Sequence, residues 1–300
     1  MSIELRVFLL SIVFTFLFYY LFFDFLSNDY YNQFLIFLLP LIWPGIAHGS
    51  LDLLIAKKYN LIRDFPSTLY FIILYVLLAF MIVIIWYLAP NIGILLFLVI
   101  SIIHFGTSDT KPNKQLILYL VEVLIRGLMP ICIPIFFFSA QVNFIFLKLF
   151  VTDSFYVEIV KINVYIFYCL ILLITILFFY FIKKKTNDNS KLISTEIILI
   201  FSCFTFFEPL ISFCLYFCFM HSLRHLIDEK KNLGLSNKQL IFNTLPITGL
   251  TLLALIFCYF FINFDDNLFK FFPILFISLA SLTVPHMLLI SWSKTIYSKN

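Results

Sequence analysis

Long apolar runs alternate with short polar segments along the whole chain. A helix that crosses a bilayer needs about 20 predominantly apolar residues, with about 17 as the lower end. Ten runs reach roughly this length and are expected to be transmembrane helices. They cover Leu5–Leu26, Gln33–Ala56, Thr68–Ala89, Asn91–Gly106, Gln115–Ser139, Asn163–Ile182, Leu192–Phe207, Leu210–Ile227, Leu240–Ile262 and Leu268–Trp292. The pattern predicts an all-α polytopic membrane protein with about ten transmembrane helices (roughly 8–10), forming a single transmembrane domain over residues 1–300.

The stretch from Leu192 to Ile227 is too long for one span and contains Glu208-Pro209, which is typical of a turn, so we expect two helices there. The first run, Leu5–Leu26, is too long for the apolar region of a signal peptide and is followed by no small-residue cleavage site. We therefore expect the first helix to be retained.

The charges between the runs indicate an orientation, because Lys and Arg concentrate on the cytoplasmic side of a membrane. With the N-terminus inside, the cytoplasmic loops carry Lys57, Lys58, Arg63, Lys111, Lys114, Lys183, Lys184, Lys185, Lys191, Lys230, Lys231 and Lys238. The short outer loops carry Asp29, Glu208, Asp265 and Asp266, and the longer fifth loop is mixed, with Lys148, Asp153, Glu158 and Lys161. Nine helices would put a basic loop outside, so ten helices with both termini cytoplasmic fit better.

The composition agrees with this class. Hydrophobic residues make up 63% of the chain, aromatic residues 20% and charged residues only 12%, well outside the range of soluble domains. The net charge of +4 is accounted for by loop lysines, so no nucleic-acid partner is expected. The six cysteines all fall within apolar runs without CxxC spacing and are expected to be small core residues rather than disulfides or zinc ligands.

All five histidines lie in or at the end of apolar segments, namely His48, His104, His221, His225 and His286. In the predicted topology they belong to the second, fourth, eighth and tenth helices, which all run toward the cytoplasm, and each lies in the later part of its helix. Ionisable groups at membrane depth are costly and are functional by default. Imidazole is also a common metal ligand. We therefore expect the histidines to converge on one metal centre in the cytoplasmic half of the membrane.

His221 and His225, in the sequence HSLRH, are four residues apart and on a helix would share one face, where both could bind one metal. Histidine ligands suit Fe, Zn, Cu or Ni. The chain has no HExxH motif, and its histidines are too few for a membrane desaturase. A bis-histidine haem would leave three of them unexplained. What remains is a mononuclear metal with about four histidine ligands, near lipid tails and thus near an apolar substrate.

Carboxylates follow two of the other histidines closely: Asp52 follows His48 in HGSLD, and Asp109 follows His104 in HFGTSD. Such carboxylates orient the second nitrogen of metal-bound imidazoles. Each could instead be a charge at the end of a loop. His286, in TVPHM, is a candidate for a fifth metal ligand, a hydrogen-bond donor to one of the ligands, or a substrate contact.

Glu122 and Arg126 lie four residues apart deep in the fifth predicted helix. We interpret them as a structural buried pair, because charges at this depth usually neutralise each other. Gly49 and Gly106, next to two of the histidines, are expected to allow close packing of backbone.

The motifs HGSLD, HFGTSD, EVLIRGLMPICIP, PLISFCLYFCFMHSLRH and TVPH occur in this order from His48 to His286. This set resembles the Brp/Blh family of bacterial and archaeal β-carotene dioxygenases, and YFCFMHSLRH is its most specific part. The resemblance implies an iron-dependent membrane enzyme that cleaves the central 15,15′ double bond of β-carotene with O2 to give two molecules of all-trans-retinal.

The resemblance also implies a site and partners. The family's proposed ligands correspond here to His48, His104, His221 and His225, which would bind Fe(2+) without a separate acid or base. The enzyme would lie in the inner (cytoplasmic) membrane, and its retinal would serve a microbial rhodopsin. The other classes considered are another metal-dependent lipid oxygenase or hydroxylase, a haem- or quinone-binding membrane subunit, and a transporter. The last is disfavoured because no internal repeat is evident.

Overall fold

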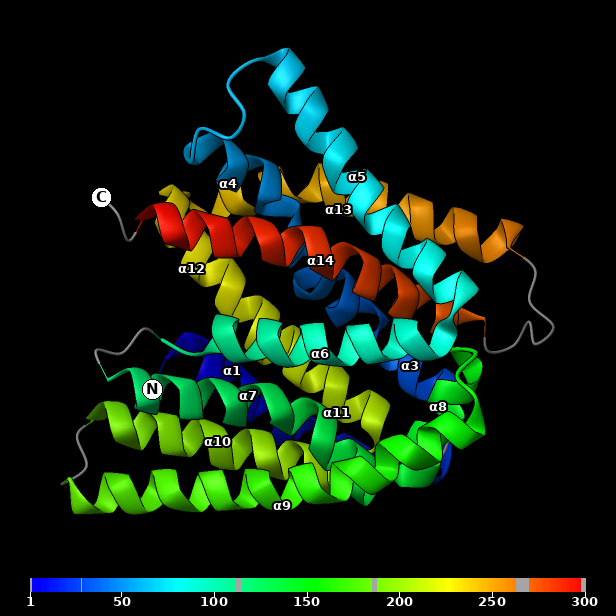
Figure 1. The fold of residues 1–300 in the computed structure, drawn as a ribbon, viewed down its shortest axis with the longest axis vertical. Coiled ribbons are helices and arrows are strands. Elements are labelled where there is room, and N and C mark those ends of the chain that lie inside the picture. The colour runs from blue at the N-terminus through cyan, green and yellow to red at the C-terminus, as the bar shows by residue number, and fades with distance from the viewer. Residues whose placement is uncertain (1, 28, 112–114, 185–187, 263–269, 298–300) are drawn as a thin grey trace. The chain divides into compact units, whose positions relative to one another are not determined.

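A computed structural model describes residues 2–27, 29–111, 115–184, 188–262 and 270–297 of the chain. Its elements, labelled in Figure 1, are α1 (Ile3–Leu21), α2 (Phe23–Leu26), α3 (Tyr30–Pro40), η1 (Leu41–Gly45), η2 (Ile46–Leu51), α4 (Asp52–Lys58), α5 (Phe65–Leu88), α6 (Pro90–Asp109), α7 (Leu116–Phe137), α8 (Ser139–Lys148), α9 (Asp153–Lys183), α10 (Asp188–Phe206), α11 (Pro209–Tyr216), η3 (Phe217–Ser222), α12 (Leu223–Leu233), α13 (Asn237–Phe261) and α14 (Phe271–Tyr297).

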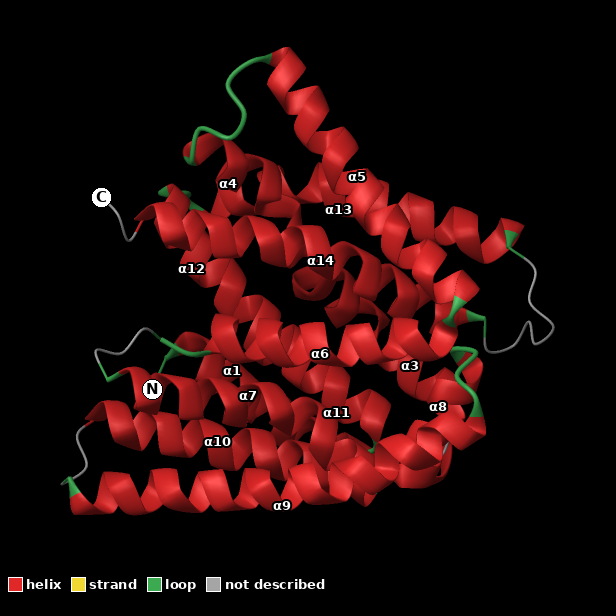
Figure 2. Ribbon diagram, viewed as in Figure 1, coloured by secondary structure: helices red, strands yellow, loops and turns green. Residues whose placement is uncertain are grey.

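These elements are helical apart from a kink at Trp43, and no strand occurs among the described residues (Figure 2). Ten helical stretches in the described ranges are long and apolar enough to cross a membrane: Ile3–Leu21, Tyr30–Lys58, Phe65–Leu88, Pro90–Asp109, Leu116–Phe137, Asp153–Lys183, Asp188–Phe206, Pro209–Leu233, Asn237–Phe261 and Phe271–Trp292. Each corresponds to one predicted span, including the two expected on either side of Glu208-Pro209. The prediction of an all-α polytopic membrane protein is confirmed.

The orientation of the chain across the membrane stays a prediction. Of the loop charges on which it rests, Lys114, Lys185, Asp265 and Asp266 lie outside the described residues, as does the predicted start of the last span at Leu268.

The chain groups into two compact units. Unit 1 comprises residues 1–45, 101–147 and 152–224. Within it α7 packs against α9 and α10, which lie beside it in Figure 1, and α11 packs against α3 and α10. The first helix, α1, packs against η3. The single domain expected from the sequence is not tested by this grouping.

Unit 2 comprises residues 46–100, 148–151 and 225–300. Helix α14 packs against α5, α4 and α13, and α13 also packs against η2. Buried apolar side chains join these elements, and they are Leu51, Ile55, Ala56, Ile62, Leu226, Leu240, Leu289 and Ile290. Helix α5 begins with a capping box between Asp64 and Ser67, whose hydrogen bonds lower the pKa of Asp64.

Two transmembrane stretches depart from regular α-helix at the residues that precede or contain histidines. Between Tyr30 and Lys58 the helix is interrupted by a kink at Leu41–Gly45, where Trp43 has non-helical backbone angles (φ −142°, ψ 117°). It continues as 3₁₀-helix at Ile46–Leu51, which contains His48. Between Pro209 and Leu233 a π-turn at Phe217–Ser222 contains His221. Such turns are rare and are often found at functional sites.

Helices α6 and α7 of unit 1 approach closely through two glycines. A Cβ atom on Gly106 would lie 2.4 Å from the carbonyl oxygen of Val123, and one on Gly127 would lie 2.1 Å from that of Ile102. The close packing expected at Gly106 is therefore present, and Gly127 adds a second contact. At Gly49 a Cβ would meet no described atom within 4 Å, so the expectation of close packing there was wrong.

Replacing Gly127 with Ala should force the two backbones apart and lower the free energy of unfolding by about 1–3 kcal/mol. Thermal unfolding of the purified protein in detergent measures the loss. Gly249→Ala in α13 is the control, because a Cβ there meets no described atom within 4 Å. Equal melting temperatures for both variants would contradict the packing role of Gly127.

Candidate functional site

Unit 1 contains the first histidine cluster, which we define as His104, His221 and Asp109. His104 lies in α6 and His221 in the π-turn η3, and their Nε2 atoms are 3.1 Å apart. Both side chains are buried, with relative exposures of 4% and 1%. The rings of Phe105 and Phe217 lie against His221, with centroid distances of 4.8 and 6.0 Å. Two imidazole nitrogens therefore face each other at hydrogen-bonding distance, beside aromatic rings.

A carboxylate fixes the orientation of His221. Its Nδ1 lies 3.2 Å from Oδ1 of Asp109, so Nδ1 donates its proton to the carboxylate, and in the neutral imidazole the lone pair is then on Nε2. The Tyr216 hydroxyl donates to Oδ2 of the same carboxylate at 2.6 Å, and Arg224 donates to its backbone carbonyl at 3.1 Å. The spacing in HFGTSD pairs Asp109 with His104, five residues earlier, whereas the carboxylate contacts His221.

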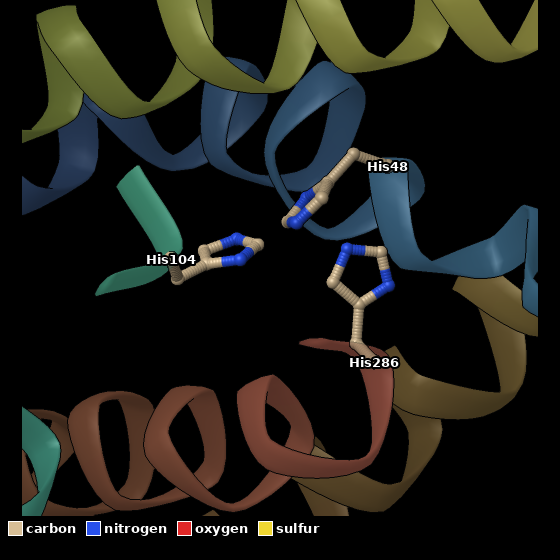
Figure 3. Close-up of side chains that lie close together, drawn as sticks. All are labelled: His48, His104 and His286. Carbon is tan, nitrogen blue, oxygen red and sulfur yellow. The ribbon is translucent and has the colours of Figure 1, made fainter. Parts of the chain in front are cut away.

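Unit 2 contains the second histidine cluster, which we define as His48, His225 and His286. The ring centroids are 5.2 Å apart for His48 and His286, 5.1 Å for His225 and His286, and 5.7 Å for His48 and His225. Figure 3 shows His48 from η2 and His286 from α14 turned toward each other. The structure thus brings three of the five predicted site histidines together here and the other two together in unit 1.

Asp52 orients His286 rather than His48. The Nδ1 atom of His286 lies 2.8 and 3.0 Å from the two carboxylate oxygens of Asp52. The Tyr75 hydroxyl, from α5, donates to Oδ2 of Asp52 at 2.8 Å. The local spacing of HGSLD indicated the wrong imidazole, because His286 comes from a helix more than two hundred residues later in the chain.

The imidazoles of each cluster fit a metal ion by their donor chemistry. Two nitrogens that each lie about 2.1 Å from one metal, at right angles, are about 3.0 Å apart, close to the 3.1 Å between the Nε2 atoms of His104 and His221. Carboxylates that hold Nδ1 leave Nε2 as the ligand atom, as is usual in metal sites. Either cluster therefore supplies donors of the kind expected for a transition metal.

A cavity of about 270 Å³ lies beside the second cluster, within unit 2. Its polar wall includes His48, His286, Asp52 and Tyr75, and its apolar wall is formed by residues of α5, α13 and α14 such as Val76, Ile247, Leu250, Leu255, Leu275, Leu279 and Leu282. The hydroxyls of Thr251 and Thr283 also line it, but they donate to carbonyl oxygens of their own helices. The cavity therefore suits an apolar ligand that meets polar groups at the histidines.

The predicted pair of Glu122 and Arg126 belongs to a larger buried ionic network in unit 1. Arg126 contacts Glu122 at 2.8 Å and Glu196 at 2.7 Å. Glu196 also accepts from Arg224 at 2.7 Å, which in turn holds the backbone of Asp109. The network thus connects the α7 pair to the first histidine cluster.

Sequence reasoning missed several of these residues. Arg224 lies between the two histidines of HSLRH, and its charge at membrane depth was a signal that could have found it. Glu196 offered the same signal in the seventh span. Tyr75 and Tyr216 offered none, because tyrosines are frequent in this chain and only the folded structure selects these two.

The ten candidate spans and the buried histidine–carboxylate clusters define a polytopic membrane protein whose imidazoles supply donors for a transition metal. Comparison with known proteins gives the family: the sequence profile of the beta-carotene 15,15′-dioxygenase family matches residues 39–294, and the chain belongs to this family. It is thus a carotenoid-cleaving dioxygenase, an oxidoreductase. The chain is 28% identical over 255 residues to a beta-carotene 15,15′-dioxygenase from uncultured marine bacterium 66A03, covering 84% of this chain and 90% of the relative. No solved structure matches the chain.

Replacing Arg126 with Leu should leave Glu122 buried without its cation and Glu196 with Arg224 alone, and breaking a buried pair costs about 3–5 kcal/mol. We expect much less folded protein in the membrane fraction, measured by quantitative immunoblot and size-exclusion chromatography. Arg6→Leu, at an exposed position of α1, is the control. Normal yield with lost activity would instead give the network a role in function.

Proposed function

We propose that the chain cleaves the central 15,15′ double bond of β-carotene with O2 to give two molecules of all-trans-retinal. One oxygen atom of O2 enters each aldehyde, so the atoms balance. Family membership supports the reaction. The structural observation that carries the proposal is the apolar cavity whose wall includes His48 and His286.

The proposed metal is Fe(2+), and its proposed ligands are His48, His104, His221 and His225. These residues come from both clusters, and the HSLRH spacing supports a shared metal because it puts His221 and His225 one helical turn apart in sequence. Bound ferrous iron with open coordination positions would supply the redox chemistry with O2. No separate acid or base is assigned.

The chain's own residues position the reactants and exclude water. At about 270 Å³ the cavity lies near the lower limit of typical ligand pockets, roughly 300–1,000 Å³, so it suits one half of a symmetric carotenoid rather than the whole molecule. Apolar side chains of α5, α13 and α14 would hold this half by burial alone. The polyene would then leave the cavity beside His48 and His286, where its centre meets the imidazoles.

The setting of the reaction is also proposed. The enzyme would lie in the inner (cytoplasmic) membrane with both termini in the cytoplasm and the metal in the cytoplasmic half. Both the substrate and retinal are apolar and would exchange with the bilayer. A microbial rhodopsin in the same membrane would be the natural acceptor of the retinal.

Expression in a bacterial host that accumulates β-carotene tests the reaction. Extracted pigments analysed by liquid chromatography should show loss of β-carotene and appearance of retinal. His221→Ala should abolish both retinal formation and iron loading, because it removes a proposed ligand, while membrane insertion stays normal. Retinal formation at the native rate in this variant would refute the proposed ligand set, and unchanged β-carotene with the iron-loaded native protein would refute the substrate.

Filling the cavity tests the substrate-binding role. Thr251→Phe should reduce kcat/KM for β-carotene about tenfold or more, since even one methylene in an apolar pocket changes discrimination by about 10–200-fold, while iron content stays normal. Leu253→Phe, two residues along α13 at a side chain that is 66% exposed, is the matched control. Equal activity of the two variants would exclude the cavity as the substrate site.

A further inference from the structure

The four proposed ligands leave His286 without a role, although it is 3% exposed and lies at the wall of the cavity. We propose that His286 is itself a ligand of the metal, through Nε2, and that Asp52 and Tyr75 are the residues that position it. This inference rests on the proposed function and extends its metal site.

The hydrogen bond between His286 and Asp52 indicates which imidazole nitrogen is available to a metal. Both oxygens of Asp52 lie within 3.0 Å of Nδ1, and Asp52 itself is 5% exposed. An ionised carboxylate accepts and cannot donate, so Nδ1 carries a proton, and in the neutral imidazole the lone pair is then on Nε2. This tautomer is the one that binds a metal through Nε2.

Unit 1 builds the same arrangement independently. There Tyr216 donates to Asp109 at 2.6 Å, and Asp109 holds Nδ1 of His221 at 3.2 Å. In unit 2 Tyr75 donates to Asp52 at 2.8 Å, and Asp52 holds Nδ1 of His286. His221 is a proposed ligand from the HSLRH motif. Because His286 is held by the same series of tyrosine, carboxylate and imidazole, we assign it the same role as His221, that of a metal ligand.

The position of the neighbouring rings also supports this role. If ring centres lie about 3.2 Å from a shared metal, two ligand rings at angles of about 90–110° are about 4.5–5.2 Å apart. The centroid of His286 lies 5.2 Å from that of His48 and 5.1 Å from that of His225. His286 thus stands at ligand spacing from both proposed ligands in unit 2.

The alternative is that His286 is a buried ion-pair partner with only a structural role. The two functions differ in what each variant changes. A structural histidine supports the fold whether or not metal is present, so its loss lowers the melting temperature of the metal-free protein. A ligand changes metal affinity and the spectrum of the bound metal.

The experiment uses the full-length protein, purified in detergent and stripped of metal. Anaerobic Fe(2+) titration gives the dissociation constant, and Co(2+) serves as a spectroscopic probe of the ligands. His286→Ala should weaken Fe(2+) binding at least tenfold and alter the visible Co(2+) spectrum. Asp52→Asn should weaken binding about 10–100-fold, the usual cost of losing such a support.

Tyr75→Phe removes only a hydroxyl and keeps the ring in place, so it remains informative if the other variants fail to fold. We expect severalfold weaker Fe(2+) binding with an unchanged melting temperature of the metal-free protein. Tyr70→Phe, in the same helix at a side chain that is 69% exposed, is the matched control and should bind normally.

Native Fe(2+) affinity and Co(2+) spectrum in both His286→Ala and Tyr75→Phe would overturn the inference. If the native protein binds iron and forms retinal while these variants bind as it does, only His286 loses its assignment. If the native protein binds no metal, or binds it and forms no retinal from β-carotene, the proposed function itself fails.

Discussion

Polar side chains in a membrane protein's interior must be paired, because no water is present to replace a lost hydrogen bond or to solvate a charge. The two carboxylates that hold imidazoles follow this constraint. The carboxylate of Asp52 takes its hydrogen bonds from an imidazole and a tyrosine hydroxyl, and Asp109 does the same. The hydrogen bonds that stabilise these buried carboxylates also fix the orientation of the imidazoles. The same contacts therefore satisfy the electrostatic requirement of the fold and set the geometry of the site.

The backbone near the histidines shows a related compromise. The kink at Leu41–Gly45 and the π-turn at Phe217–Ser222 both interrupt regular α-helical hydrogen bonding, which is tolerated within a membrane only where protein covers the segment. Leu41–Gly45 is preceded by Pro40 and contains Pro44, which cannot donate a backbone hydrogen bond. Phe217–Ser222 has neither proline nor glycine. Its irregular turn is stabilised by its surroundings in unit 1, including contacts with α1 and α11.

The sequence predicted what depends on local composition. The ten spans follow from apolar length, and the division at Glu208-Pro209 follows from the helix-breaking character of proline. The histidines could be recognised as candidate functional residues because each lies in or at the end of an apolar segment, where an ionisable side chain is costly. Pairing across the chain was not predictable: the partner of Asp52 is His286, not the nearby His48, because side-chain direction in the folded unit decides the contact. Tyr75 and Tyr216 were likewise hidden among sixteen tyrosines.

Tyr75, Asp52 and His286 form part of the cavity wall as well as a hydrogen-bonded series. An apolar ligand that fills this space would lower the local polarity, and hydrogen bonds to a charged acceptor strengthen in such surroundings. Ligand entry and the rigidity of the His286 ring are therefore thermodynamically linked. Linkage is reciprocal, so an interaction that immobilises the ring also favours occupancy of the cavity. Ligand binding in the cavity and the hydrogen bonds that hold the His286 ring would therefore each stabilise the other.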